Sequence, residues 1–293
     1  TLLAVLLLTS KGAAGVTESN NAASAVLAVI GVEEKPTLWG AAEARLLNVP
    51  EPESGLQGAG QWVSFSEWLK ERGGAATAES WEEDQQVRDA AGELWRRPGR
   101  PELAEYLDSQ KQALDALGAA VQRERFYIPM LMEDGSGTTT SRPSLLSARI
   151  GNPSRLRNAG DALLARAILR LGEGDQAGYL TDLTAALRLA RLMAQQPSIM
   201  EYLVARAADV DVLRTIDAAA ASRNLDAANA GKLRTLTDAA PWPSPVHVLD
   251  GCERYLILDL LEAISQGSTM AASGIPLAGK SLVPVHYDEA LAE

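Results

Sequence analysis

The chain has 293 residues, of which 46% are hydrophobic but only 5% are aromatic. The excess is Ala and Leu, which favour helices, and few β-branched residues accompany them, so the composition argues against an all-β fold. The formal net charge of −11 disfavours nucleic acid as a partner. One cysteine, Cys252, and two histidines, His247 and His286, exclude a disulfide framework and a structural zinc site.

The chain opens with an apolar run at residues 2–8, and its first residue is Thr1, not Met. We therefore expect a processed chain or a fragment of a longer protein. A membrane helix needs about 20 apolar residues. Because Lys11 ends the run too soon, no complete transmembrane helix is expected, and the run is interpreted as the end of an anchor or signal. This places the protein at a membrane or outside the cytoplasm, with a cytoplasmic location as the alternative.

Residues 6–17 also resemble the second re-entrant hairpin of the dicarboxylate/amino acid:cation symporter family. The resemblance implies that the carbonyls of Ser10, Lys11 and Ala13 coordinate a cation and that Val16 contacts the substrate. It ends at residue 17, where Glu-Ser-Asn-Asn replaces the small residues of the family. Two interpretations stay open: an anchor end followed by a small-residue spacer, or a fragment of, or fusion to, a symporter that transports dicarboxylates with Na⁺ or H⁺.

From Asn21 onward, apolar residues recur at helical spacing. Helices are predicted over residues 22–30 and 38–47, followed by a loop rich in Pro and Gly at residues 50–60. Five of the six tryptophans lie between residues 39 and 95. Such clustering could form an aromatic groove, but large aromatic side chains more often close the core of a helical layer, and we expect the core.

A charged helix is predicted over residues 79–97, with acidic residues at its start and arginines at its end, as the helix dipole favours. The acidic residues, which are Glu79, Glu82, Glu83 and Asp84, need no metal to explain them. A longer helix is predicted over residues 102–127. Residues 134–144 form the most loop-like stretch and the best boundary. Their glycines and hydroxyls could hold a phosphate, but the stretch lacks the lysine of a phosphate-binding loop and a preceding strand, so we expect a surface loop.

Four helices are predicted in the C-terminal half, over residues 158–171, 177–195, 198–222 and 226–239. Short connections make neighbouring helices antiparallel. Facing apolar stripes on the first two helices resemble a tetratricopeptide-type hairpin, with Arg-Leu-Gly-Glu-Gly-Asp at residues 170–175. The third helix is too long for that family, and no period of about 34 residues recurs.

Residues 20–265 as a whole resemble a group of uncharacterised bacterial helical proteins that usually carry an N-terminal membrane anchor. The resemblance rests on the Asn-Ala-Ala opening at residues 21–23, on Val63-Ser64-Phe65, and on the Ala-Arg-Ala-Ile-Leu-Arg-Leu-Gly-Glu-Gly hairpin at residues 165–174. These motifs are compositionally loose, and the resemblance implies no activity.

One segment, residues 241–253, brings together the ingredients of a thiol nucleophile and its base, namely His247, Asp250, Cys252 and Glu253. The spacing of Asp250 and Glu253 instead predicts a helix cap and capping box before a buried helix at residues 255–261. A lone cysteine at that place is more often a small buried side chain than a nucleophile. Asp259 and Glu262 share a helical face, and nothing opposite them is identified.

The sequence therefore predicts an all-α protein of antiparallel helical hairpins, in a bundle or a short helical-repeat layer. The expected regions are an apolar remnant (1–20), an N-terminal helical region (21–128), a linker (129–154), a C-terminal hairpin region (155–266) and an irregular tail (267–293). The expected function is a non-catalytic interaction or structural module for an unknown protein partner, attached to a membrane through its N-terminus, with no catalytic residues, cofactor or metal. The symporter fragment is the first alternative, and a weak thiol enzyme using Cys252 is the second.

Overall fold

The computed structural model describes residues 15–17, 19–31, 62–73, 80–128, 131–132, 148–149, 153–238 and 242–265. Within these ranges the regular structure is helical except for one antiparallel pair of two-residue strands, so the predicted all-α class is confirmed. The elements in chain order are α2 (Ala22–Ile30), α4 (Phe65–Glu71), α5 (Ser80–Ala91), η1 (Arg97–Gly99), α6 (Pro101–Ser109), α7 (Lys111–Ala120), β1 (Leu131–Met132), β2 (Ala148–Arg149), α8 (Pro153–Gly172), α9 (Gln176–Met193), α10 (Ile199–Ser222), α11 (Ala227–Asp238), α12 (Val246–Val248), the π-helical turn η3 (Leu249–Glu253) and α13 (Arg254–Ser265).

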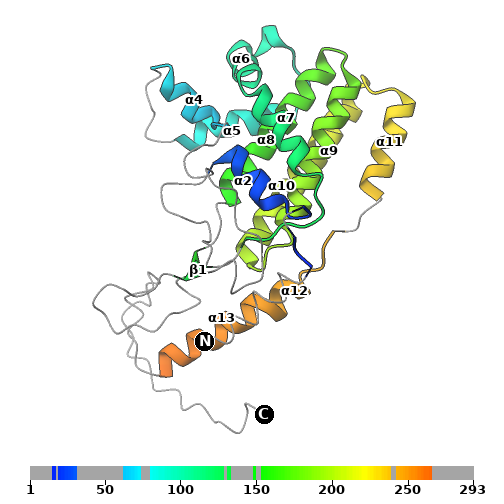
Figure 1. Ribbon diagram of the computed structural model, residues 1–293. Helices are drawn as coiled ribbons and strands as arrows, with labels where there is room; N and C mark the ends of the chain where they lie inside the picture. Colours follow the sequence, from blue (N-terminus) through cyan, green and yellow to red (C-terminus); the bar gives the residue numbers. More distant parts are fainter. Residues whose placement is uncertain are drawn as a thin grey trace.

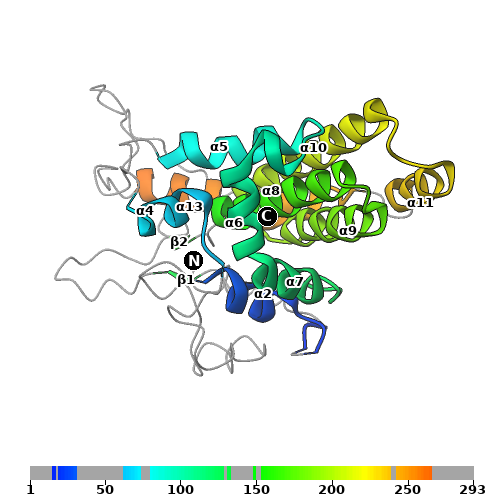
Figure 2. The same cartoon turned by 90° about the horizontal axis from the view of Figure 1, so that it is seen from above.

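The central helix of the bundle is α8, and α5, α9 and α10 pack around it (Figures 1 and 2). Its predicted apolar stripe is fully buried and consists of Leu163, Leu164, Ala167, Ile168 and Leu171. The facing side chains of Leu183 and Leu187 on α9 are buried as well, and this apolar contact holds the α8–α9 hairpin together. The four helices predicted in this half of the chain are thus present, each within a few residues of its expected ends.

Asn21 fastens the first described helix to the end of the N-terminal half. Its side-chain oxygen accepts hydrogen bonds from the backbone N–H groups of Ala23 (3.1 Å) and Tyr127 (3.1 Å), and its Nδ2 donates to the Tyr127 carbonyl (3.1 Å). The Ala22 N–H donates to the Arg125 carbonyl at 2.7 Å. Because Asn21 is fully buried, removing its side chain would leave several polar groups without partners away from water.

The tryptophans of the N-terminal half belong mainly to the core. The three that are buried are Trp62, Trp68 and Trp95. Trp81 is 63% exposed, and Trp39 lies outside the described residues. Trp68 packs against Phe65 and Tyr106 with ring centroids 5.9 and 5.8 Å away, which is the separation expected of favourable aromatic pairs. The expectation that these aromatics close a helical layer therefore holds for the three buried residues.

The single long helix predicted over residues 102–127 is wrong. The chain forms two shorter helices, α6 and α7, which meet at Gln110. The Ser109 hydroxyl donates to the Tyr106 carbonyl at 2.6 Å, and the Gln110 side chain accepts a hydrogen bond from the Val63 N–H at 3.0 Å. A serine that bonds to a nearby carbonyl competes with the helical pattern only weakly. The contact with Val63 holds Gln110 at the junction, and the break depends on it. The helix predicted over residues 79–97 is also shorter, because α5 ends at Ala91.

One hydrophobic core joins the N-terminal and C-terminal regions that the sequence suggested. Helix α5 packs on α8, and α7 packs on α9, so the two regions cover each other. Within the predicted linker at residues 129–154, β1 pairs with β2 through Leu131 opposite Arg149. The predicted loop at residues 134–144, the predicted helix at 38–47 and the tail at 267–293 lie outside the described residues.

Candidate functional site

The segment proposed as a thiol site lies on the C-terminal helical run of α12, η3 and α13. Cys252 is buried, and burial, aided by the negative charges of Glu253 and Glu201, raises the pKa of its thiol to about 11. A thiol with such a pKa stays protonated at neutral pH, whereas a catalytic thiolate needs a lowered pKa. The exposed His247 ring makes a 2.7 Å hydrogen bond through Nδ1 to the Ser244 carbonyl. Both observations argue against the thiol-enzyme hypothesis.

The helix start predicted at Asp250 is wrong, because residues 246–265 form one continuous helical run. Asp250 lies exposed inside the π-helical turn. The Glu253 side chain accepts a 3.0 Å hydrogen bond from the backbone N–H of Ile199, the first residue of α10. The capping spacing is present in the sequence, but this carboxylate satisfies an unpaired N–H at the start of another helix instead. Helix α13 was also expected to be buried, and it is partly exposed.

The symporter resemblance falls almost entirely outside the described residues. Ser10, Lys11 and Ala13 lie there, as does the apolar run at residues 2–8. Val16 is described, is 7% exposed and belongs to the hydrophobic core. Among the helices that the structure describes, none combines the length and the apolarity needed to cross a membrane.

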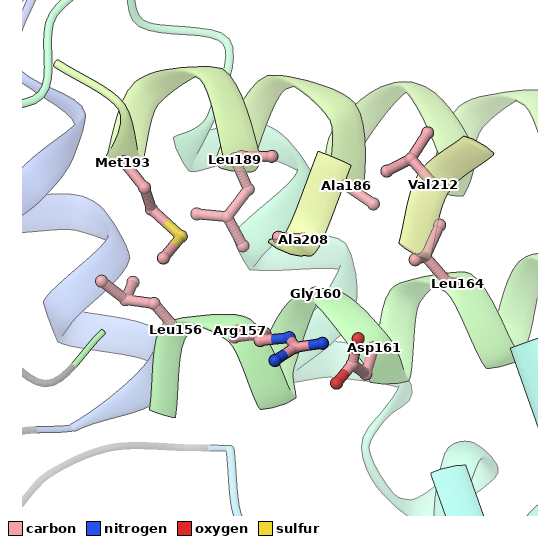
Figure 3. A pocket seen from close by; sticks show the side chains of 11 residues that line it. Leu156, Arg157, Gly160, Asp161, Leu164, Ala186, Leu189, Met193, Ala208 and Val212 are labelled. Carbon is pink, nitrogen blue, oxygen red and sulfur yellow. The ribbon is translucent and has the colours of Figure 1, made fainter. Parts of the chain in front are cut away.

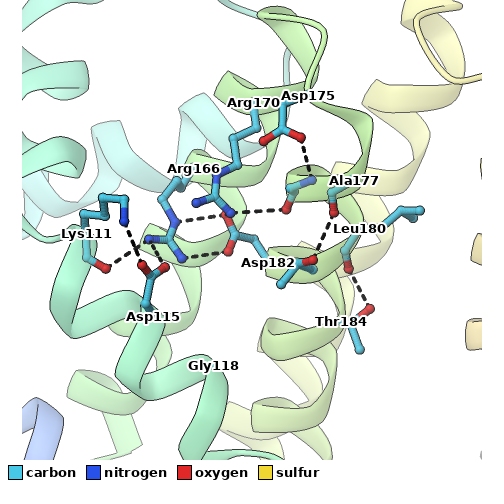
Figure 4. A network of polar contacts seen from close by, with 12 residues as sticks. Lys111, Asp115, Gly118, Arg166, Arg170, Asp175, Ala177, Leu180, Asp182 and Thr184 are labelled. Atoms are coloured by element: carbon cyan, nitrogen blue, oxygen red, sulfur yellow. Dashed lines mark hydrogen bonds and ion pairs between the residues drawn. The ribbon is translucent and has the colours of Figure 1, made fainter.

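The first buried polar cluster joins α7, α8 and α9 around Arg166 (Figure 4). Its guanidinium donates through Nε and Nη2 to the two carboxylate oxygens of Asp182, at 2.9 and 2.7 Å. Arg170 contacts the same carboxylate at 2.8 Å, and Asp115 contacts Arg166 at 2.9 Å. Burial, the dominant influence, raises the pKa of Asp182 despite these arginines. Paired donors and acceptors of this kind orient helices relative to one another.

A cleft of about 250 Å³ opens beside this cluster. The charged residues that line it are Arg97, Asp108, Lys111, Arg166, Arg170, Glu173 and Asp175. Each cation already has an acidic partner: Arg97 pairs with Asp108 and Glu173, Lys111 with Asp115, and both other arginines with Asp182. Because these charges neutralise one another, the cleft does not offer the free positive charge that would attract an anion.

A second buried cluster ties α8 to α5 and α10. Arg88 donates through Nε to Asp161 at 2.9 Å, and Arg157 donates through Nη2 to Asp211 at 2.6 Å. The two pairs are linked, since the Arg88 Nε lies 3.9 Å from Asp211. Asp84 belongs to the acidic group predicted at the start of α5. It accepts hydrogen bonds from Ser66 on α4 and from Asn158 on α8, so it links these two helices to α5.

Asp161 is a buried carboxylate whose surroundings shift its pKa strongly. Burial raises its pKa to about 6, with the negative charge of Asp211 adding to the shift and the positive charges of Arg88 and Arg157 opposing it. Beside it lies a cavity of about 10 Å³ between α8, α9 and α10, lined mostly by apolar side chains (Figure 3). This volume is about that of one water molecule and is too small for a substrate. Both clusters are therefore interpreted as parts of the scaffold.

The remaining candidate is an exposed apolar surface. Of the ten large hydrophobic side chains that are exposed among the described residues, nine lie on α10 or on the C-terminal helical run. We call them the α10–α13 surface: Met200, Leu203, Val210, Leu213, Val246, Leu249, Ile257, Leu258 and Leu261. Sequence reasoning missed them, although α10 carries apolar residues on more than one face, and that pattern signals more apolar area than one core contact covers.

An aromatic cluster holds the C-terminal run against the start of α10. The Trp242 indole N–H donates to the Tyr202 hydroxyl at 2.8 Å, and that hydroxyl donates to the Pro243 carbonyl at 2.9 Å. The Arg206 guanidinium stacks 4.6 Å from the Trp242 ring centroid and pairs with Asp209 at 2.8 Å. Beyond this anchor, α13 extends past the bundle (Figure 1). The start of the C-terminal run is therefore held against α10, and α13 continues from it.

Fold and site together define an all-α helical bundle with buried ionic clusters and an exposed apolar face on its last long helices. No family model matches the chain, and no curated protein or solved structure is significantly similar to it. The resemblances suggested by the sequence therefore stay predictions, and the function has to be argued from the surface itself.

Proposed function

We propose that the chain is a non-catalytic interaction module and that the α10–α13 surface is where it contacts a protein partner. The observation that carries this proposal is the concentration of exposed apolar side chains on α10 and the C-terminal run. Met200 and Leu203 are each 54% exposed, and Ile257 is also 54% exposed. Exposed apolar area costs free energy in water, so a concentration of exposed apolar side chains commonly marks a surface that a partner covers.

The rigidity of the same region supports this proposal. Tyr202, Trp242 and Glu253 hold the start of the C-terminal run on α10, so this part of the contact surface is organised before a partner binds. A preorganised surface loses less conformational entropy on association. Attachment to a membrane through the apolar run at residues 2–8 is part of the same proposal.

Site-specific photo-crosslinking in cells tests this function. A benzophenone amino acid placed at Leu203 or Leu258 should give discrete crosslinked products, because a bound partner lies over these positions. The matched control is the same group at Trp81, an exposed apolar position on α5 outside the α10–α13 surface. Absence of products at both Leu203 and Leu258, or equal products at Trp81, would contradict the proposal.

A further inference from the structure

The exposed residues of α10 form a stripe on the side of the helix that faces away from the bundle. We call Met200, Leu203, Val210 and Leu213 the α10 stripe; they are 46 to 54% exposed. The opposite side of α10 buries Ala205, Val212 and other residues against the bundle. The stripe spans about 20 Å along the axis at 1.5 Å per residue. It is long enough to contact another helix over several turns.

The α10 stripe is symmetric about its own middle. Met200 and Leu213 lie equally far from the point between Arg206 and Ala207, and so do Leu203 and Val210. A two-fold axis through that point would run a second α10 antiparallel to the first. It would set Leu203 against the second copy's Val210 near the middle of the contact, and it would bring Met200 level with the second copy's Leu213 at the edges. Self-complementary contacts of this kind are what two-fold dimers require.

From this symmetry we propose that the partner of the α10 stripe is a second copy of this chain, bound antiparallel through α10. The inference rests on the proposed function and names its partner. The small Ala207 lies next to the axis and lets two helices approach closely. Arg206 is held by Asp209 and Trp242, so the axis does not bring two unpaired positive charges together.

Charge at the ends of the contact agrees with the same arrangement. The symmetry places the exposed Arg214 opposite Ile199 of the second copy. The N–H of Ile199 is bonded to the Glu253 carboxylate, so Arg214, which also lies 3.7 Å from Asp211 of its own chain, meets a further negative charge on the other copy. Because the axis repeats this pairing, it occurs twice in the dimer. Complementary charges at the rim fix the register of an interface more than they strengthen it.

Sedimentation velocity of the full chain over a roughly hundredfold concentration range tests the dimer, since self-association depends on concentration. The weight-average mass should rise from 31.1 kDa towards twice that value. Leu203→Glu should keep the chain monomeric throughout. Trp81→Glu, on α5, is the matched control: Trp81 is exposed but lies outside the α10–α13 surface, so this variant should dimerise like the parent chain. Circular dichroism should show equal helicity for all three, because both substituted positions are exposed.

A charge exchange tests the antiparallel register itself. Leu203→Glu and Val210→Arg should each weaken the homodimer, whereas a mixture of the two should associate again, because the carboxylate introduced in one chain then faces the guanidinium introduced in the other. A chain that stays monomeric, or a dimer that Leu203→Glu leaves intact, would overturn the inference. If the chain is monomeric but crosslinks at Leu203 to a different protein, only the second-copy inference fails. If nothing crosslinks, the proposed function fails too.

Discussion

The burial of Asp161 disfavours the charged form of its carboxylate. It is 2% exposed and contacts Arg88, yet its pKa is raised to about 6 from an ordinary value of 3.8 because burial outweighs the ion pair. The folded chain therefore retains a proton that the unfolded chain releases as the pH rises between these two values. The contribution of Asp161 to folding stability should therefore fall across that window, and most of this contribution should be lost by about pH 6.

The substitution Asp161→Asn should remove this dependence. Between about pH 4 and pH 6 the unfolding free energy of the parent chain should fall relative to that of the variant by about 3 kcal/mol, an upper estimate from two pKa units. The variant also loses the Arg88 ion pair, which lowers its unfolding free energy at higher pH. This loss does not bring back the dependence of the unfolding free energy on pH between pH 4 and pH 6. Urea unfolding at several pH values measures the difference, and a difference that does not change with pH would contradict the prediction.

Cys252 gives a second test at the scale of single residues. Its burial and raised pKa predict that it reacts slowly with a thiol reagent at pH 8 in the folded chain and rapidly in urea. Cys252→Ala should change stability only modestly, since one small buried side chain replaces another, and it should leave the crosslinks at Leu203 unchanged. Rapid reaction in the folded chain, or loss of those crosslinks, would revive the thiol hypothesis.

At the scale of elements, the end of α8 is fixed by a close approach to the segment before η1. A Cβ atom added at Gly172 would lie only 2.1 Å from the Trp95 carbonyl oxygen. Gly172→Ala should therefore force α8 and this segment apart and cost about 1–3 kcal/mol. The matched control is Gly231→Ala in α11, where nothing lies within 4 Å and the change should stabilise by about 0.5–1 kcal/mol. Urea unfolding should therefore give opposite signs for the two glycines.

Helices α8 and α9 supply much of the hydrophobic core, and Leu183 on α9 has no exposed surface. Leu183→Asp should bury an unpaired carboxylate against the α8 stripe, at a cost of several kcal/mol that rivals the stability of about 5–15 kcal/mol of a typical domain. Circular dichroism and thermal melting should report an unfolded or molten chain. Thr181→Asp, two residues earlier on the exposed side of α9, should melt like the parent chain.

Periodicity located α8 to α11 because apolar residues recur at helical spacing in each of them. It failed at Gln110, because that break depends on the Val63 N–H, which lies 47 residues earlier in the chain. It also failed at Glu253, whose capping spacing serves Ile199 on another helix. Neither partner is visible in the local sequence, so the deviations arise from tertiary contacts that override local preference.

The candidate surface could not be located from the sequence for a related reason. Helix α10 carries apolar residues on opposite sides, with Ala205 and Val212 on one and Leu203 and Val210 on the other. A pattern that is apolar on both sides shows that the helix has two contacts to make, but only the packed structure shows which side α8 and α9 cover. The uncovered side then becomes the candidate for a partner.

At the scale of the whole molecule, the two helical regions share one core and should not fold separately. Helices α5 and α7 cover α8 and α9, and the Asp161 carboxylate is paired with Arg88 from α5. A fragment of residues 153–265 would expose the covered apolar faces and leave Asp161 without that arginine. Lost burial at about 25 cal/mol per Å² and an isolated buried charge both oppose its folding.

We therefore expect the fragment of residues 153–265 to be helical but to melt without a cooperative transition. Mixing it with a fragment of residues 15–128 should restore a cooperative melt, because each fragment supplies the surface that the other buries. Replacing Arg88 by Ala in the 15–128 fragment should weaken that recovery, since Asp161 then stays unpaired when the fragments meet. A fragment of residues 153–265 that melts as cooperatively alone as the full chain would show that the C-terminal helices form an independent domain.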